Sequence, residues 1–174
     1  MIAIDQSLFW GIYNLAGKSA GWDFLIVFFG EYFFYIVLAV FAYFAYCAHK
    51  RGGAAQIKLY GWAIISAPIA RFGVAEIIRL FYYRLRPYAE LSLPHLIADS
   101  AYSFPSGHTI FMFALATTTY FFNKKLAYFL FAAGILIGLA RVAGAVHYPS
   151  DILGGAVLGI LTALVLRAMF KRGA

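Results

Sequence analysis

Charged side chains are scarce in this sequence. Lysine, arginine, aspartate and glutamate together make up 12% of the 174 residues, whereas 64% of the residues are hydrophobic and 20% are aromatic. A soluble domain normally carries about 25% charged residues. The composition therefore excludes an ordinary soluble domain and indicates an integral membrane protein.

Cysteine is nearly absent, and the chain has no linker that would divide it. The one cysteine, Cys47, lies inside an apolar run, so no internal disulfide can form and the redox compartment is left open. There is no internal repeat and no low-complexity tract. We therefore expect residues 1–174 to form a single membrane domain.

Five apolar segments approach the length of about 20 residues that a bilayer span needs. They are Asp23–Ala48, Leu59–Phe81, His108–Phe122, Leu126–Val146 and Ile152–Met169. The third is short, so we expect it to begin at Ser106 or to end beyond Phe122. The first twenty residues contain too short an apolar stretch for a span and lack the basic leader of a secretory signal. The sequence predicts an all-α, polytopic transmembrane helical bundle with about five spans and an N-terminal interfacial helix.

The net charge of +7 does not indicate nucleic-acid binding, because the basic residues alternate between the two predicted sides of the bundle. One side carries the basic residues of 49–58, 124–125 and 167–172, and the positive-inside rule makes that side the cytoplasm. The opposite side carries four arginines against this rule: Arg79, Arg84, Arg86 and Arg141. We expect these four to serve a site or to pair with acids.

Three short motifs fall on that outer side. The first reads A-R-V-A-G-A-V-H-Y-P-S-D-I-L-G-G over 140–155, and Pro149 suits the first turn of a helix there. Asp151 lies four residues after His147, close enough to fix the tautomer of the imidazole and raise its basicity. Arg141 could bring a guanidinium to an anion beside that histidine. The alternative is an interfacial cluster that anchors two helix ends.

The second motif reads R-L-F-Y-Y-R-L-R-P over 79–87, where Pro87 is expected to end the helix of the second span. Seven residues separate Arg79 from Arg86, close to two helical turns, so both could face one multiply charged anion. The alternative is that these arginines, Arg84 above all, reach out to lipid headgroups. Glu76 could brace Arg79 from one turn earlier.

The third motif, F-P-S-G-H-T over 104–109, stands at the start of the third span. Small residues at a helix start present backbone N–H groups to an anion, and His108 in the first turn can deliver a proton. A simple capping turn is the alternative. Deeper in the first two spans, Glu31 and Arg71 lie at similar depths and could form a buried pair.

As an ordered set, the motifs resemble the type 2 phosphatidic acid phosphatases (PAP2), which are membrane relatives of the vanadium haloperoxidases and bacterial acid phosphatases. The family signature is K-x6-R-P, P-S-G-H and S-R-x5-H-x3-D, and this chain has R-x6-R-P, P-S-G-H and A-R-x5-H-x3-D over Arg79–Asp151. Arg79 replaces the usual lysine. It keeps the positive charge but offers a planar guanidinium with several N–H donors in place of a single ammonium group. Ala140 replaces a serine, which removes a minor polar contact.

The resemblance implies a haloperoxidase-like core and a role for each motif residue. His147 would attack phosphorus and be oriented by Asp151, while His108 would protonate the leaving oxygen and then activate water. The phosphoryl oxygens would be held by Arg79, Arg86, Ser106, the backbone N–H of Gly107, and Arg141. No metal and no cofactor are implied.

The resemblance also implies the function, a membrane lipid phosphatase with its site at the outer, periplasmic end of a bacterial inner-membrane protein. The expected partners are a lipid phosphate substrate and membrane lipids, with no nucleic acid, and the oligomeric state is open. Undecaprenyl diphosphate is the favoured substrate; phosphatidylglycerophosphate phosphatase and lipid A 1-phosphatase are the alternatives. A further alternative is phosphotransfer, in which the phosphoryl group passes to a second lipid instead of water. A non-catalytic anion transporter or scaffold would not need two histidines and an orienting acid.

The connection Tyr88–Ser103 is apolar for an exposed loop because of Leu91, Leu93, Leu96 and Ile97. We expect it to lie in the membrane interface, at the rim of a lipid entry.

Overall fold

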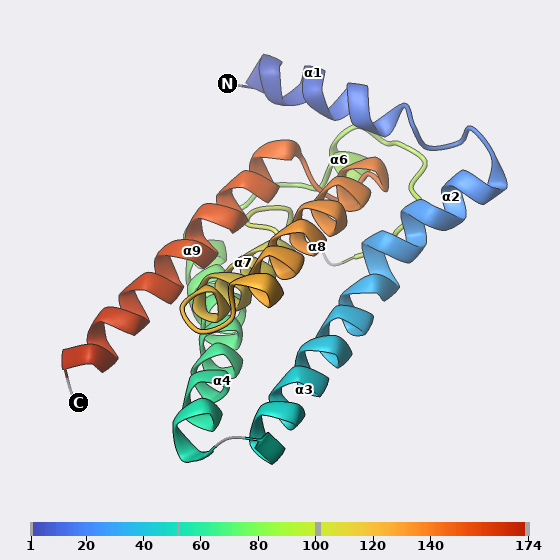
Figure 1. Cartoon of the computed structure of the whole chain (residues 1–174). Helices are drawn as coiled ribbons and strands as arrows, with labels where there is room; N and C mark the ends of the chain where they lie inside the picture. Colours follow the sequence, from blue (N-terminus) through green and yellow to red (C-terminus); the bar gives the residue numbers. More distant parts are fainter. Residues whose placement is uncertain (1, 52, 100–101, 173–174) are drawn as a thin grey trace.

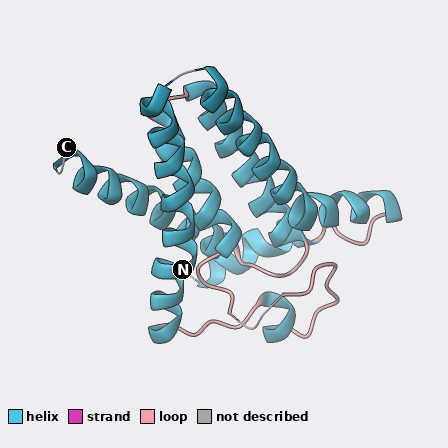
Figure 2. Cartoon of the chain, turned by 90° about the horizontal axis from the view of Figure 1, so that it is seen from below, coloured by secondary structure: helices cyan, strands magenta, loops and turns pink. Residues whose placement is uncertain are grey.

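The computed structural model describes residues 2–51, 53–99 and 102–172, and the regular structure of these residues is entirely helical. The long helices pack side by side, and helix α1 (Ile2–Tyr13) lies across one end of them (Figure 1). The long loops gather with the short helix α6 (Pro87–Glu90) on one side of the bundle (Figure 2). The predicted helical bundle is therefore confirmed at the level of the fold class.

The first long helix is continuous from Ala20 to Arg51 over 32 residues. It consists of α2 (Ala20–Val27), the π-helical turn η1 (Phe28–Tyr32) and α3 (Phe33–Arg51). Ser19 caps its start by accepting a hydrogen bond from the N–H of Trp22 at 3.2 Å. The π-helical turn carries Glu31 and accommodates one extra residue, a feature that is frequent at functional sites.

The second helical rod ends at Phe81, the residue predicted as the end of the second span, but Pro87 does not end it, so that part of the prediction is wrong. It consists of α4 (Gly53–Pro68), the π-helical turn η2 (Ile69–Val74) and α5 (Ala75–Phe81). The backbone leaves the helix at Tyr82, with φ −132° and ψ 103°. Arg86 is extended because a proline follows it, and Pro87 begins α6 instead of ending α5.

Helix α7 (Gly107–Tyr120) is the centre of the bundle, packed against α4, α8 (Lys124–Ala143) and α9 (Pro149–Arg172). Its 14 residues extend about 21 Å, less than the hydrocarbon thickness of a bilayer. Its neighbours bury it, which explains how a short segment can stand in the middle of the bundle. Three helices of the described chain are long and apolar enough to cross a membrane: Ala20–Arg51, Lys124–Ala143 and Pro149–Met169. The count of five spans stays a prediction.

Glycines on α9 bring it unusually close to α7. A Cβ atom added to Gly159 would lie 2.4 Å from the carbonyl oxygen of Ile110, and one added to Gly155 would lie 2.9 Å from that of Ser106. Small residues allow this approach of two backbones in membrane bundles. The start of α9 is thereby held beside the start of α7.

The N-terminal helix and the long loop close the same end of the bundle. Phe9 of α1 is fully buried against Val142 and Tyr148, and the hydroxyl of Tyr13 donates to the carbonyl of Pro94 at 2.9 Å. Ile97 of the loop is buried between η1 and the end of α8 and lies against Gly30 and Gly144. Ile97 therefore anchors the loop inside the bundle, and the place of the loop as a lid or lipid entry rim stays a prediction.

Candidate active site

The three predicted motifs meet at the end of the bundle that α1 covers. The N–H of Ser106 donates to the carbonyl oxygen of Asp151 at 3.1 Å, which joins the third motif to the first. Arg79 donates to the carbonyl of Pro105 at 3.0 Å, and Arg86 donates to that of Val146 at 2.7 Å. The predicted residues that the structure buries here are Arg79, Arg86, Ser106, Gly107, Arg141, His147 and Asp151.

His147 is buried with its two ring nitrogens in different surroundings. Nε2 lies 3.3 Å from Nη1 of Arg86, and Nδ1 lies 3.7 Å from Oδ2 of Asp151. Because arginine offers donors only, Nε2 must accept, and the proton of a neutral ring is on Nδ1. Burial lowers the pKa of His147 to about 4; Asp151 opposes this shift, and Arg141 and Arg86 add to it. At neutral pH the imidazole is therefore neutral, with a lone pair on Nε2.

Asp151 is the third residue of α9 and its carboxylate is held from several directions. Oδ2 accepts from the hydroxyl of Ser103 at 2.5 Å and from the N–H of Tyr148 at 2.7 Å, which is half of a capping box. Oδ1 accepts from Arg84 at 2.7 Å. The distance of 3.7 Å to His147 is longer than a hydrogen bond, so a shift of about 1 Å would complete one.

Three residues outside the predicted catalytic and phosphate-binding set support the site: Asp5, Arg84 and Ser103. Arg84 lies 4.1 Å over the ring of Tyr148 and pairs with Asp5 at 2.7 Å as well as with Asp151. Asp5 of α1 also accepts from the N–H and the hydroxyl of Ser150, at 2.8 and 2.5 Å. The alternative that placed Arg84 among lipid headgroups is therefore wrong. The expectation that Arg84 serves a site or pairs with acids is confirmed by its pairs with Asp5 and Asp151.

The carboxylate of Asp99 bridges two arginines that were predicted to hold phosphate. Its Oδ2 accepts a short hydrogen bond from Nη2 of Arg141 and lies 3.3 Å from Nη2 of Arg86. Arg141 also donates to the carbonyl of Gly30 at 3.0 Å and lies 3.8 Å from Glu31. Burial lowers the pKa of Arg86 to about 10, so the guanidinium stays charged at neutral pH. The structure thus holds an internal anion between Arg86 and Arg141.

A second charge network lies at the π-helical turn η2. Arg71 and Arg79 both bind Oε1 of Glu76, at 2.6 and 2.8 Å. The predicted brace of Arg79 by Glu76 is confirmed. The predicted pair of Glu31 with Arg71 is wrong, because the two side chains turn toward different partners, Arg141 and Glu76.

His108 lies in the first turn of α7 and is the least buried of the predicted catalytic residues. Its ring packs edge-on against Phe34, with centroids 4.8 Å apart. Within the described part of the chain, no group of three His, Cys, Asp or Glu residues could hold a metal ion.

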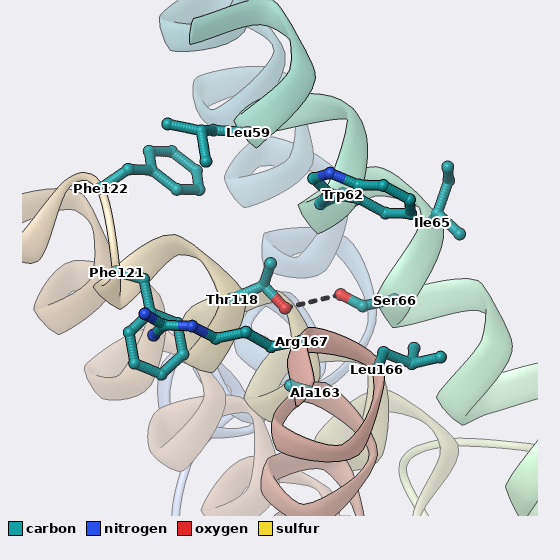
Figure 3. Close-up of a pocket in the computed structure, with 10 residues that line it drawn as sticks. All are labelled: Leu59, Trp62, Ile65, Ser66, Thr118, Phe121, Phe122, Ala163, Leu166 and Arg167. Carbon is teal, nitrogen blue, oxygen red and sulfur yellow. Dashed lines mark hydrogen bonds between the residues drawn. The ribbon is translucent and has the colours of Figure 1, made fainter. Parts of the chain in front are cut away.

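Two cavities lie near the bundle ends. One of about 740 Å³ adjoins the site beside α1, and its wall includes Asp5, Arg84 and Tyr148. The other, of about 230 Å³, lies between α4, α7 and α9 (Figure 3). There Ser66 and Thr118 share a hydrogen bond of 2.8 Å and Arg167 covers the ring of Phe121. This second cavity contains no predicted catalytic residue.

A model of the PAP2 superfamily matches residues 56–173. The chain belongs to the PAP2 superfamily. This PAP2 protein is 29% identical to the undecaprenyl-diphosphatase BcrC of Bacillus subtilis over 91% of its own length and 80% of the relative's. It is 30% identical to the bacitracin transport permease protein BcrC of Bacillus licheniformis over 59% of its length, spanning about half (51%) of that relative. Its fold is similar to that of LpxE from Aquifex aeolicus, with a TM-score of 0.74, 23% identity and 93% of each chain covered.

Proposed function

We propose that this PAP2 protein removes a phosphate from a lipid diphosphate through a phosphohistidine on His147, with undecaprenyl diphosphate as the first candidate. The observation that carries the proposal is the state of His147. Its neutral ring turns the Nε2 lone pair toward Arg86, and a fixed carboxylate lies behind Nδ1. A buried nucleophile with an orienting acid and cations in front of it is the arrangement that phosphoryl transfer needs.

In the first step, the lone pair on Nε2 of His147 forms a bond to the terminal phosphorus. The bond from phosphorus to the leaving oxygen breaks, and His108 gives that oxygen a proton. The growing positive charge on the imidazole is stabilised by Asp151 at Nδ1. Negative charge on the phosphoryl oxygens is stabilised by Arg79, Arg86, Arg141, Ser106 and the N–H of Gly107.

In the second step, His108 takes a proton from water, the water oxygen bonds to phosphorus, and the bond from phosphorus to Nε2 breaks. Inorganic phosphate leaves and His147 returns to its neutral form. A lipid hydroxyl or phosphate in place of water would give phosphotransfer. The steps need no metal, so we expect turnover to persist in a chelator such as EDTA.

The lipid and the membrane side are the finer parts of the proposal. Alignment with a Bacillus subtilis undecaprenyl-diphosphatase over 91% of the chain supports the lipid. Phosphatidylglycerophosphate phosphatase and lipid A 1-phosphatase remain the alternatives within the family. The site lies at the end of the bundle opposite the α3–α4 connection and its basic residues (Figure 1), which supports a site that faces the periplasm.

The test is phosphate release by the purified protein in detergent micelles. Undecaprenyl diphosphate, phosphatidylglycerophosphate, phosphatidic acid and lipid A are compared at equal surface concentration. We expect undecaprenyl diphosphate to give the highest kcat/KM, and His147→Gln to lower kcat by at least about 10³-fold. Full turnover by His147→Ala would refute the mechanism.

The rival from another class is a non-catalytic anion transporter or scaffold. The name of the Bacillus licheniformis relative, a transport permease protein, gives it a specific basis. This rival function predicts that the protein binds phosphate but releases no phosphate from any lipid of the panel. A trapped ³²P-phosphohistidine on the wild type, absent from His147→Gln, would exclude this rival.

A further inference from the structure

We propose that Arg71 binds the second, lipid-linked phosphate of a lipid diphosphate and thereby selects diphosphates over monophosphates. The inference rests on the proposed function, since it assigns a subsite beside the attacked phosphate. None of the three motifs includes Arg71, which lies eight residues before Arg79.

Arg71 lies directly against the start of α7. A Cβ atom added to Gly107 would lie 2.3 Å from Nε of Arg71 and 2.8 Å from its Cζ. Nε is therefore within about 4 Å of the Cα of Gly107. The N–H of Gly107 is one of the proposed donors to the attacked phosphate. The guanidinium of Arg71 therefore lies next to the proposed position of that phosphate.

Arg71 approaches this point from the side of the bilayer. Its backbone lies about 12 Å deeper along the helical rod than that of Arg79. The guanidinium lies 5.2 Å over the ring of Phe72, which is 68% exposed on the bundle surface. The tail of a bound lipid stays in the bilayer, so the lipid-linked phosphate must lie on the bilayer side of the terminal one. The guanidinium of Arg71 supplies a positive charge on that side.

The side chain of Arg71 also has donors to offer. Glu76 binds Nη1, and within the described residues no hydrogen bond engages Nε or Nη2. Its side chain is 26% exposed, whereas those of Arg79 and Arg141 are 7% and 1% exposed. Because Glu76 also binds Arg79, it fixes the spacing between the two guanidiniums. The two guanidiniums therefore lie side by side around one carboxylate oxygen, an arrangement that suits two phosphates joined through one oxygen.

A purely structural role for Arg71 makes a different prediction. If Arg71 only positioned Glu76, and through it Arg79, the loss of Arg71 would lower the turnover of every substrate that binds Arg79. Diphosphates and monophosphates with the same tail would then lose turnover equally. A ratio of kcat/KM values for two such substrates separates the two roles.

The experiment compares farnesyl diphosphate with farnesyl monophosphate in detergent micelles. We expect Arg71→Met to lower kcat/KM for the diphosphate by about 10- to 100-fold, the range of one lost charge-assisted contact. Turnover of the monophosphate should stay nearly unchanged, and Arg71→Lys should recover part of the loss. The control is Arg167→Met in the cavity at the other end of the bundle (Figure 3), which should leave both substrates unaffected.

An equal loss for the two substrates, or no loss, would overturn the assignment, and so would a wild type that prefers the monophosphate. Phosphate release from neither substrate by the wild type would instead refute the proposed function. Should Arg71→Met fail to fold, the wild type and Arg71→Lys still test the subsite through inhibition. Methylenediphosphonate should inhibit the wild type at about tenfold lower concentration than inorganic phosphate, and Arg71→Lys should narrow that difference. Equal inhibition of the wild type by the two anions would overturn the assignment of Arg71 to this subsite.

Discussion

The carboxylate of Asp99 occupies the space between Arg86 and Arg141, and Asp99→Asn removes its charge with almost no change in volume. In the proposed reaction, phosphate binds these same two arginines. Carboxylate and phosphate therefore compete for them, and the carboxylate must leave before phosphate can bind. We expect Asp99→Asn to bind phosphate more tightly than the wild type does.

The size of the effect follows from the contacts. A charge-assisted hydrogen bond contributes about 1.5–3 kcal/mol. The side chain of Asp99 is 30% exposed and its contact with Arg86 is long at 3.3 Å, so we take the lower end for a single bond. About 1.5 kcal/mol corresponds to a tenfold change in affinity.

The assay is competitive inhibition of farnesyl diphosphate hydrolysis by inorganic phosphate. The inhibition constant should fall about tenfold in Asp99→Asn, and the KM for the lipid should fall with it. Asp23→Asn is the matched control, because its carboxylate accepts from the N–H of Gly17 and contacts no arginine of the site. Unchanged or weaker inhibition in Asp99→Asn would show that Asp99 holds the arginines in place instead of competing for them.

Three further predictions concern stability and packing. The pKa of His147 is about 4 in the folded protein against an ordinary 6.5, so the unfolded chain binds more protons below pH 6.5. The wild type should therefore lose up to about 3 kcal/mol as the pH falls from 6.5 to 4, and the apparent Tm of His147→Gln should fall less over that range. Asp5→Asn should lower the apparent Tm, by about 1–2 kcal/mol in stability, and reduce kcat several-fold, since it weakens the brace on Arg84; an unchanged Tm and kcat would contradict this. Gly107→Ala should displace the flexible side chain of Arg71 and lower diphosphate turnover with little change in Tm. Gly159→Ala, whose new Cβ would meet the backbone of Ile110, should instead lower Tm strongly, and similar melting of the two alanine variants would refute this reading.

Local signals in the sequence predicted the helix starts well. Pro149 begins α9 and Ser106 precedes the first residue of α7, because each residue type suits a helix start for its own chemistry. The extended segment after α5 could not be predicted in the same way. The helix stops at Phe81, as predicted, but Pro87 was expected to end it, and the extended segment between them lets Arg84 and Arg86 reach Asp151 and Val146. Contacts with a distant part of the chain determine the course of that segment.

The motif residues and the local brace of Arg79 by Glu76 could be predicted, but supports from distant parts of the chain could not. Asp5 and Ser150 are 145 residues apart, and no local pattern links the first helix to the last. The pairing of Glu31 and Arg71 failed for a related reason. Equal depth in two helices says nothing about which way each side chain turns, and the π-helical turns η1 and η2 alter that rotation.

Asp151 joins the folding of α9 to the state of His147, the proposed nucleophile. Its carboxylate caps the N-terminus of the helix through Tyr148, binds Arg84 and Ser103, and stands behind Nδ1 of His147. A group with that many donors stays ionised and cannot turn away, so the tautomer of His147 is fixed before substrate arrives. On the other face of the imidazole, the cations that would receive phosphate are held by Asp99, a residue of the loop. The proposed nucleophile is thus preorganised by the most buried contacts of the site, while the proposed binding of phosphate would break one of its more exposed contacts.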